Sequence, residues 1–148
     1  MFRDRYGEEA AHDLHLLVVL ERAVRSVEHR LFAHIRSGYL TPGQFDVLEA
    51  LYHNGPLTVN EVIAKTLGSS GNIGFVIDNL IESGLVEKRV DECDRRVRHV
   101  ALSEAGRRRM AEFFPEHVQV VRSTFASLDR EEKQILIDLL RKLGKGVG

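Results

Sequence analysis

Guanidinium groups gather in one short stretch of the chain. Residues 88–109 hold eight lysines and arginines against four acidic residues, although the formal net charge of the whole chain is −1. Affinity for phosphate depends on the local field and not on the total charge. The stretch is therefore suited to hydrogen bonding and ion pairing with nucleic acid. Its arginines form two groups: Arg95, Arg96 and Arg98, then Arg107, Arg108 and Arg109.

An asparagine with complementary chemistry stands earlier in the chain. Asn72 lies at the expected start of a helix, and its amide can pair with the N6 and N7 atoms of adenine. Apolar residues at i, i+3, i+4 and i+7 from Ile73 predict one buried stripe on that helix. The residues near its start that face outward or cap it are Ser69, Ser70, Gly71, Asn72, Gly74 and Phe75.

The outward residues have different capacities. Ser70 can serve a base or a phosphate, the two glycines allow close approach, and Phe75 can touch a thymine methyl group. Ordinary alternatives stay open: Asn72 also suits a helix start, and Phe75 also suits a partly buried helix position. Thr58, at the start of a preceding short helix, can bring backbone N–H groups near a phosphate.

Catalytic and metal chemistry is poorly represented. Cys93 is the single cysteine, which excludes an internal disulfide framework and suits a reducing cytoplasm. It is a candidate redox residue beside the arginines, with an incidental surface thiol as the alternative. The seven histidines show no CxxC or HExxH spacing, so no metal site and no cofactor is predicted. No nucleophile elbow or phosphate-binding loop is present, so we do not expect an enzyme.

Three elements must position these groups. A capping box at Thr58 and Glu61 opens a short helix, and a second helix follows from Ser69 or Ser70 to Gly84. Residues 85–90 and 97–102 read as the arms of a hairpin with its tip at 91–96. Residues 41–103 are thus expected to form a winged helix-turn-helix lobe, which places one helix in a DNA major groove.

Long amphipathic helices flank that lobe. Residues 8–36 carry a narrow apolar seam from Leu14 to Ile35, and residues 104–145 carry two further helices that start at Ser103 and Asp129. A lone winged lobe does not need this much extra helix, so we expect a helical dimer interface. The alternative is that these helices pack only on their own domain. The expected fold is mainly α with a small β-hairpin wing.

The totals fit one domain of 148 residues. Apolar residues make up 43% and charged residues 29%, which is ordinary for a globular protein. No run approaches the roughly 18 apolar residues of a membrane span. No signal-peptide core follows Met1, so a cytoplasmic protein without a membrane partner is expected.

The chain resembles the MarR family of bacterial winged-helix transcription regulators over nearly its whole length. The resemblance lies in the order and spacing of four segments: 40–48 (LTPGQFDVL), 55–59 (GPLTV), 80–86 (LIESGLV), and Asp94-Arg95-Arg96 leading to Leu102-Ser103-Glu104-Ala105-Gly106. The resemblance implies a homodimer that binds pseudo-palindromic double-stranded operators. It also implies release from DNA by small aromatic ligands or by thiol oxidation.

The resemblance also implies roles for two residues of the wing. An Asp-x-Arg pattern in the family places an arginine in the minor groove, and Asp94 and Arg96 occupy it here, with Asp94 orienting the arginine. This chain departs from the family at Ser70, Gly74 and Phe75, where Arg or Thr is frequent. Its Ser-Gly-Asn opening is similar to a subgroup that answers quinones and related electrophiles, which suggests a small aromatic or quinone-like effector.

The leading hypothesis is a ligand-responsive transcriptional repressor that acts as a homodimer. A ligand between the long helices and the DNA-binding lobe would favour a dimer with the wrong spacing of its two recognition helices. An aromatic crevice near Phe32, His34, Tyr39 and Phe45 is the expected location. The alternative is a winged-helix protein-interaction module without specific DNA binding.

Overall fold

Six helices and one hairpin are the elements whose bounds lie in the described part of the chain. The computed structural model describes residues 5–66 and 70–148. The elements in chain order are α2 (Glu8–Ser37), α3 (Pro42–Asn54), α4 (Val59–Lys65), α5 (Ser70–Glu82), β1 (Val86–Val90), β2 (Arg98–Leu102), α6 (Glu104–Thr124) and α7 (Arg130–Val147). This is the mainly α fold with a hairpin wing that the sequence predicts. None of the described helices is long and apolar enough to cross a membrane.

Local side-chain hydrogen bonds fix the helix starts. At α3 the Gln44 amide donates to the Thr41 hydroxyl at 3.2 Å, and the Thr41 amide donates to the Gln44 side chain at 3.0 Å. Two orphan amides are satisfied at once, which defines the first turn. The same capping box opens α4, with Thr58 and Glu61, and α7, with Asp129 and Glu132. The side chain of Ser103 caps α6.

The core lies under helix α5. Ile73, Val76, Ile77 and Leu80 are all buried, as the stripe predicts, and α5 packs on α3, α4 and β1. Leu48 of α3 is fully buried in the same cluster. Burial of this stripe orients α5, so the residues on its other side must face outward.

The wing is an antiparallel hairpin with a small addition. Val86 pairs with Leu102 and Val90 pairs with Arg98 at the two ends of the ladder. Leu57, just before α4, exchanges two backbone hydrogen bonds with Val100, at 3.0 and 2.7 Å. This bridge was not predicted, since a single paired residue carries no periodic signal. It ties the base of the wing to the helix-turn-helix.

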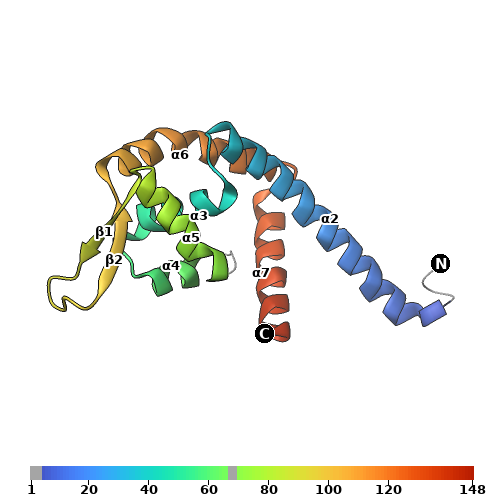
Figure 1. The fold of residues 1–148 in the computed structure, drawn as a ribbon. Helices are drawn as coiled ribbons and strands as arrows, with labels where there is room; N and C mark the ends of the chain where they lie inside the picture. The colour runs from blue at the N-terminus through green and yellow to red at the C-terminus, as the bar shows by residue number, and fades with distance from the viewer. Residues whose placement is uncertain (1–4, 67–69) are drawn as a thin grey trace.

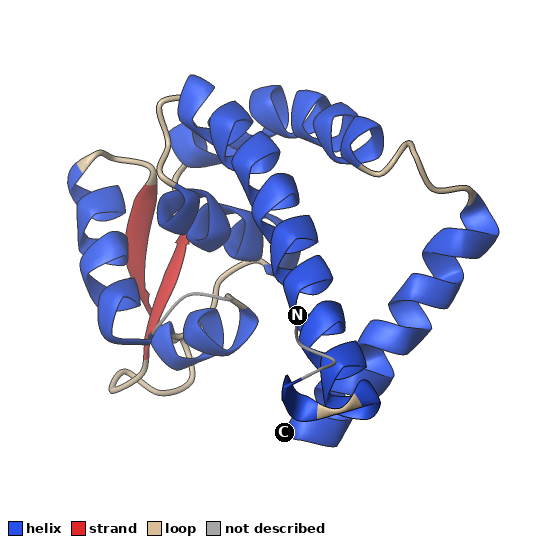
Figure 2. Cartoon of the chain, turned by 90° about the vertical axis from the view of Figure 1, so that its right-hand side faces the viewer, coloured by secondary structure: helices blue, strands red, loops and turns tan. Residues whose placement is uncertain are grey.

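The outer helices extend away from this lobe. Figure 1 shows α2 and α6 crossing at one end of the lobe, with α2 continuing far beyond it and α7 standing apart; Figure 2 shows the same separation from the side. Arg30 of α2 donates to the Ser123 hydroxyl of α6 at 2.9 Å, which links the two helices. No residue of α7 is buried within the single chain.

Candidate nucleic-acid interface

The outward face of α5 carries the residues that the sequence singled out. Asn72, Gly74 and Phe75 are exposed, and 66% of Phe75 is accessible. The partly buried position considered for Phe75 is therefore not what the structure has. Ser70 is the first residue of α5 and Gly71 the second, whereas Ser69 lies outside the described residues.

The arginines at the tip of the wing are positioned by hydrogen bonds to neighbouring residues of the turn. An oxygen of Asp94 accepts from the Arg96 amide at 3.0 Å and from the Arg96 Nε at 3.3 Å, and the Arg96 side chain is still 93% exposed. Arg98 donates to the carbonyl of Arg95 and so braces the turn. Arg95 is exposed as well. All three arginines are thus exposed to solvent, and Arg98 also shapes the loop.

Asp91 is a wing residue that the sequence reasoning missed. One of its carboxylate oxygens accepts from the amides of Cys93, at 2.8 Å, and Asp94, at 2.9 Å. These two hydrogen bonds, with Asp94 contributing more, lower the pKa of Asp91. His99 lies 3.6 Å away on β2. An aspartate that ends a strand and begins a polar turn was the available signal. Cys93 itself is an exposed free thiol.

Thr58 and the second arginine group have structural contacts. The Thr58 hydroxyl accepts from the Glu61 amide at 3.2 Å, and its own amide donates to the Glu61 carboxylate at 2.7 Å. Both groups are therefore engaged at the start of α4. Arg109 donates to the carbonyl of Gly38, and Arg108 lies 3.4 Å from Glu104.

A cluster of aromatic rings joins the outer helices to the winged lobe. His34 of α2 stacks on Phe113 of α6 with ring centroids 4.6 Å apart, and Phe45 of α3 lies 4.5 Å from His117 of α6. Phe32 is half-buried against the same core. Of the four residues expected near a crevice, His34 and Phe45 therefore lie together, each against Phe113 and His117. Tyr39 does not join them: it is 92% exposed and its φ is 59°.

Two buried nitrogens in this cluster have no hydrogen-bond partner among the described residues. They are Nε2 of His34 and Nδ1 of His117. The two rings stack with centroids 5.5 Å apart. Burial, and to a smaller degree the neighbouring His34, lowers the pKa of His117 from its ordinary value of 6.5. The cluster offers ring surfaces and two unsatisfied polar atoms. Sequence reasoning missed Phe113 and His117 because their proximity to α2 and α3 is a tertiary effect.

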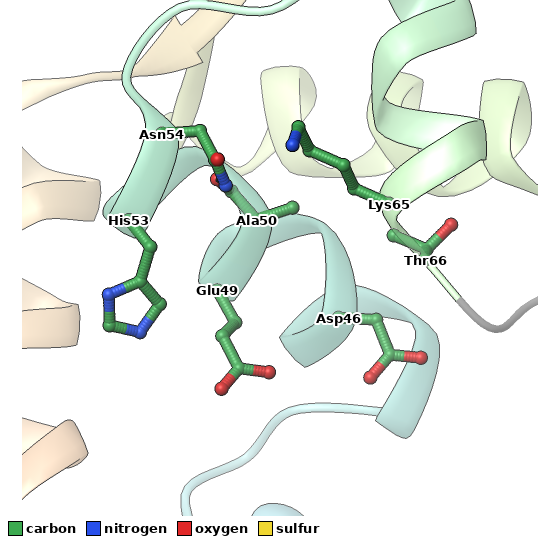
Figure 3. A pocket seen from close by; sticks show the side chains of 7 residues that line it. All are labelled: Asp46, Glu49, Ala50, His53, Asn54, Lys65 and Thr66. Atoms are coloured by element: carbon green, nitrogen blue, oxygen red, sulfur yellow. The ribbon is translucent and has the colours of Figure 1, made fainter. Parts of the chain in front are cut away.

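A separate hollow of about 350 Å³ lies between α3 and the end of α4. Figure 3 shows Asp46, Glu49 and His53 reaching it from α3, with Lys65 from α4. Partial burial raises the pKa of Asp46 and of Glu49. Within the ranges 5–66 and 70–148, no group of three potential ligands is placed to hold a metal ion.

The arrangement of an exposed helix face beside an arginine-tipped hairpin matches known regulators. The sequence profile of the MarR family matches residues 40–97. The transcriptional regulator MhqR of Bacillus subtilis is 33% identical over 131 residues, which is 88% of this chain and 90% of MhqR. The chain belongs to the MarR family. It is therefore a DNA-binding transcriptional regulator and not an enzyme.

Solved MarR-family structures share the fold. BpsR of Bordetella bronchiseptica, whose DNA binding is regulated by 6-hydroxynicotinic acid, superposes with a TM-score of 0.77 at 28% identity, over 97% of this chain and 96% of BpsR. AbsC of Streptomyces coelicolor superposes with a TM-score of 0.78 at 23% identity, over 96% of this chain and 95% of AbsC. The outer helices of this MarR chain are thus shared as well as the winged lobe.

Proposed function

We propose that this MarR protein is a ligand-responsive repressor that binds a pseudo-palindromic operator as a homodimer. The observation that carries the proposal is the joint presentation of the exposed α5 face and the arginine-tipped wing. The α5 face would enter the major groove, with Asn72 reading a base edge near the N-terminal end of the helix. Arg96 would reach into the adjacent minor groove, held by Asp94.

Apolar side chains that stay exposed in the single chain support the homodimer. Helix α7 leaves six large apolar side chains between 40 and 59% exposed: Ile135, Leu136, Ile137, Leu139, Leu140 and Leu143. The groove between α6 and α7 measures about 390 Å³ and is lined mostly by apolar side chains. On α2, Leu16, Leu17, Val19 and Val24 are about half exposed as well. Contiguous apolar surface of this kind is characteristic of an oligomer interface.

The aromatic cluster supports a site for the effector. His34, Phe45, Phe113 and His117 connect the outer helices to the lobe that carries α5. An aromatic or quinone-like molecule could stack on these rings and hydrogen-bond to the unsatisfied imidazole nitrogens. Such a ligand would favour a dimer in which the recognition helices are no longer about one DNA turn apart. The regulation of BpsR by an aromatic acid is consistent with this class of effector.

The test is binding to the DNA immediately upstream of the protein's own gene, measured by fluorescence anisotropy. We expect tight binding by two chains per duplex and at least about 1,000-fold weaker binding to a scrambled duplex. Addition of 6-hydroxynicotinic acid, of substituted phenols and of quinones to the complex then tests release. Equal affinity for both duplexes, and for duplexes selected from a random pool, would contradict the proposal.

A further inference from the structure

Phe75 is an aromatic side chain without an evident structural use. It lies roughly 150° around α5 from the centre of the buried stripe, since successive residues turn by about 100°. Its ring is 66% exposed, and it makes none of the ring contacts found in the described part of the chain. A phenyl ring left in water contributes little to the stability of the monomer. Its position near the N-terminal end of the recognition helix points instead to a contact with DNA.

The neighbours of Phe75 on α5 are two amides, the exposed carboxylate of Asp78 and a glycine. Asn72 and Asn79 stand three residues before and four residues after it, so the three side chains form one row along the helix. Gly74 borders this row, and a Cβ there would meet nothing within 4 Å. The glycine is therefore not required by packing within the chain. Its absent side chain leaves low relief beside Phe75, which lets the ring approach the floor of a groove.

The charge of α5 limits which bases it can read. Residues 70–82 contain no lysine, arginine or histidine, and Asp78 and Glu82 are exposed. The commonest contact to guanine, from an arginine or lysine to O6 and N7, is thus absent from this helix. An amide suits the N6 and N7 atoms of adenine, and an apolar ring suits the thymine 5-methyl group. Both contacts select A·T pairs.

We propose that α5 reads A·T pairs in the major groove, with the ring of Phe75 packed against the 5-methyl group of a thymine. This inference rests on the proposed function, which places α5 in that groove. The arginines of the wing then supply the cationic contacts that the helix lacks. A narrow minor groove, which arginine favours, is itself a property of A·T-rich sequence, so the two elements select compatible DNA.

The experiment removes only the methyl group. Duplexes are selected from a random-sequence pool by the wild-type protein, and each thymine of a half-site is replaced in turn by deoxyuridine. At one thymine we expect about a four-fold loss of affinity, equivalent to the burial of one methyl group. Replacing that thymine in both half-sites should give roughly a fifteen-fold loss, since the two contacts are independent.

The variant Phe75→Ala, combined with the deoxyuridine duplexes, gives a double-mutant cycle between the ring and the methyl group. The variant should bind the thymine duplex about ten-fold or more weakly and should no longer distinguish thymine from deoxyuridine at that position. Asn72→Ala is the matched control, because it should lose affinity yet keep the full thymine preference. Both residues are exposed, so both variants should keep the circular dichroism and Tm of the wild type.

Three results would overturn the inference. One is that no thymine replacement weakens binding by more than about two-fold, which is less than the burial of one methyl group predicts. Another is that the thymine preference persists in Phe75→Ala. The third is selection of half-sites made only of G·C pairs. Failure to select any sequence from the pool would instead overturn the proposed function, and this inference with it.

Discussion

At the scale of single residues, Gly74 separates folding from function. Glycine inside a helix costs about 0.5–1 kcal/mol relative to alanine, and a Cβ here meets nothing. Gly74→Ala should therefore raise the free energy of unfolding by about that amount, measured by urea denaturation. It should weaken operator binding, because the added methyl group stands between α5 and the DNA. Higher stability with unchanged affinity would show that the DNA does not approach this position closely.

His117 should make the free energy of unfolding depend on pH. Burial lowers its pKa below the ordinary 6.5, so below that pH the unfolded chain binds the proton more readily than the folded one. The free energy of unfolding should thus be largest above pH 6.5 and fall as the pH decreases through the folded pKa. His117→Phe should flatten this slope in urea denaturation between about pH 7.5 and 5.5. An unchanged slope in His117→Phe would contradict the assignment.

At the scale of elements, the wing depends on an aspartate that points inward. Asp91 holds the amides of Cys93 and Asp94, and Asp94 in turn holds Arg96. Asp91→Ala removes the first of these contacts at a position outside the core. Operator affinity should fall by about five-fold per wing, with little change in Tm. Asp91→Asn keeps an acceptor oxygen, so its operator affinity should fall less. Equal losses of affinity in both variants would mean that the charge of Asp91, and not its hydrogen bonds to the turn, is what matters.

The elements also show how far sequence alone can lead. The α5 stripe, the box at Thr58 and the two arms of the hairpin follow from spacing within a few residues, so they are predictable from the sequence. The Leu57–Val100 bridge and the contact of His34 with Phe113 join distant segments, and no local pattern marks them. Tyr39 was expected in the crevice because it is aromatic and nearby in sequence. Its left-handed backbone, just after α2, turns it outward instead.

At the scale of the whole molecule, α7 is expected to fold fully into place only against a second copy. Leu139→Glu puts a charge at the centre of its apolar face, where Leu139 is 57% exposed in the single chain. We expect a shift towards monomer in sedimentation-velocity ultracentrifugation and a loss of operator binding. Gln134→Glu makes the same change of charge on the polar side of α7 and should leave the dimer intact. A dimeric Leu139→Glu protein would place the interface elsewhere.

The most direct test of the central claim is the salt dependence of operator binding for the wild type and Arg96→Ala. An arginine in the minor groove also neutralises phosphate charge, and each phosphate charge neutralised contributes about −0.9 to the slope of log K against log salt. Two wings in a dimer should therefore make the slope about two units shallower in Arg96→Ala, together with weaker binding. An unchanged slope and affinity, with wild-type protein bound equally to operator and scrambled DNA, would contradict a winged-helix dimer that reads this site.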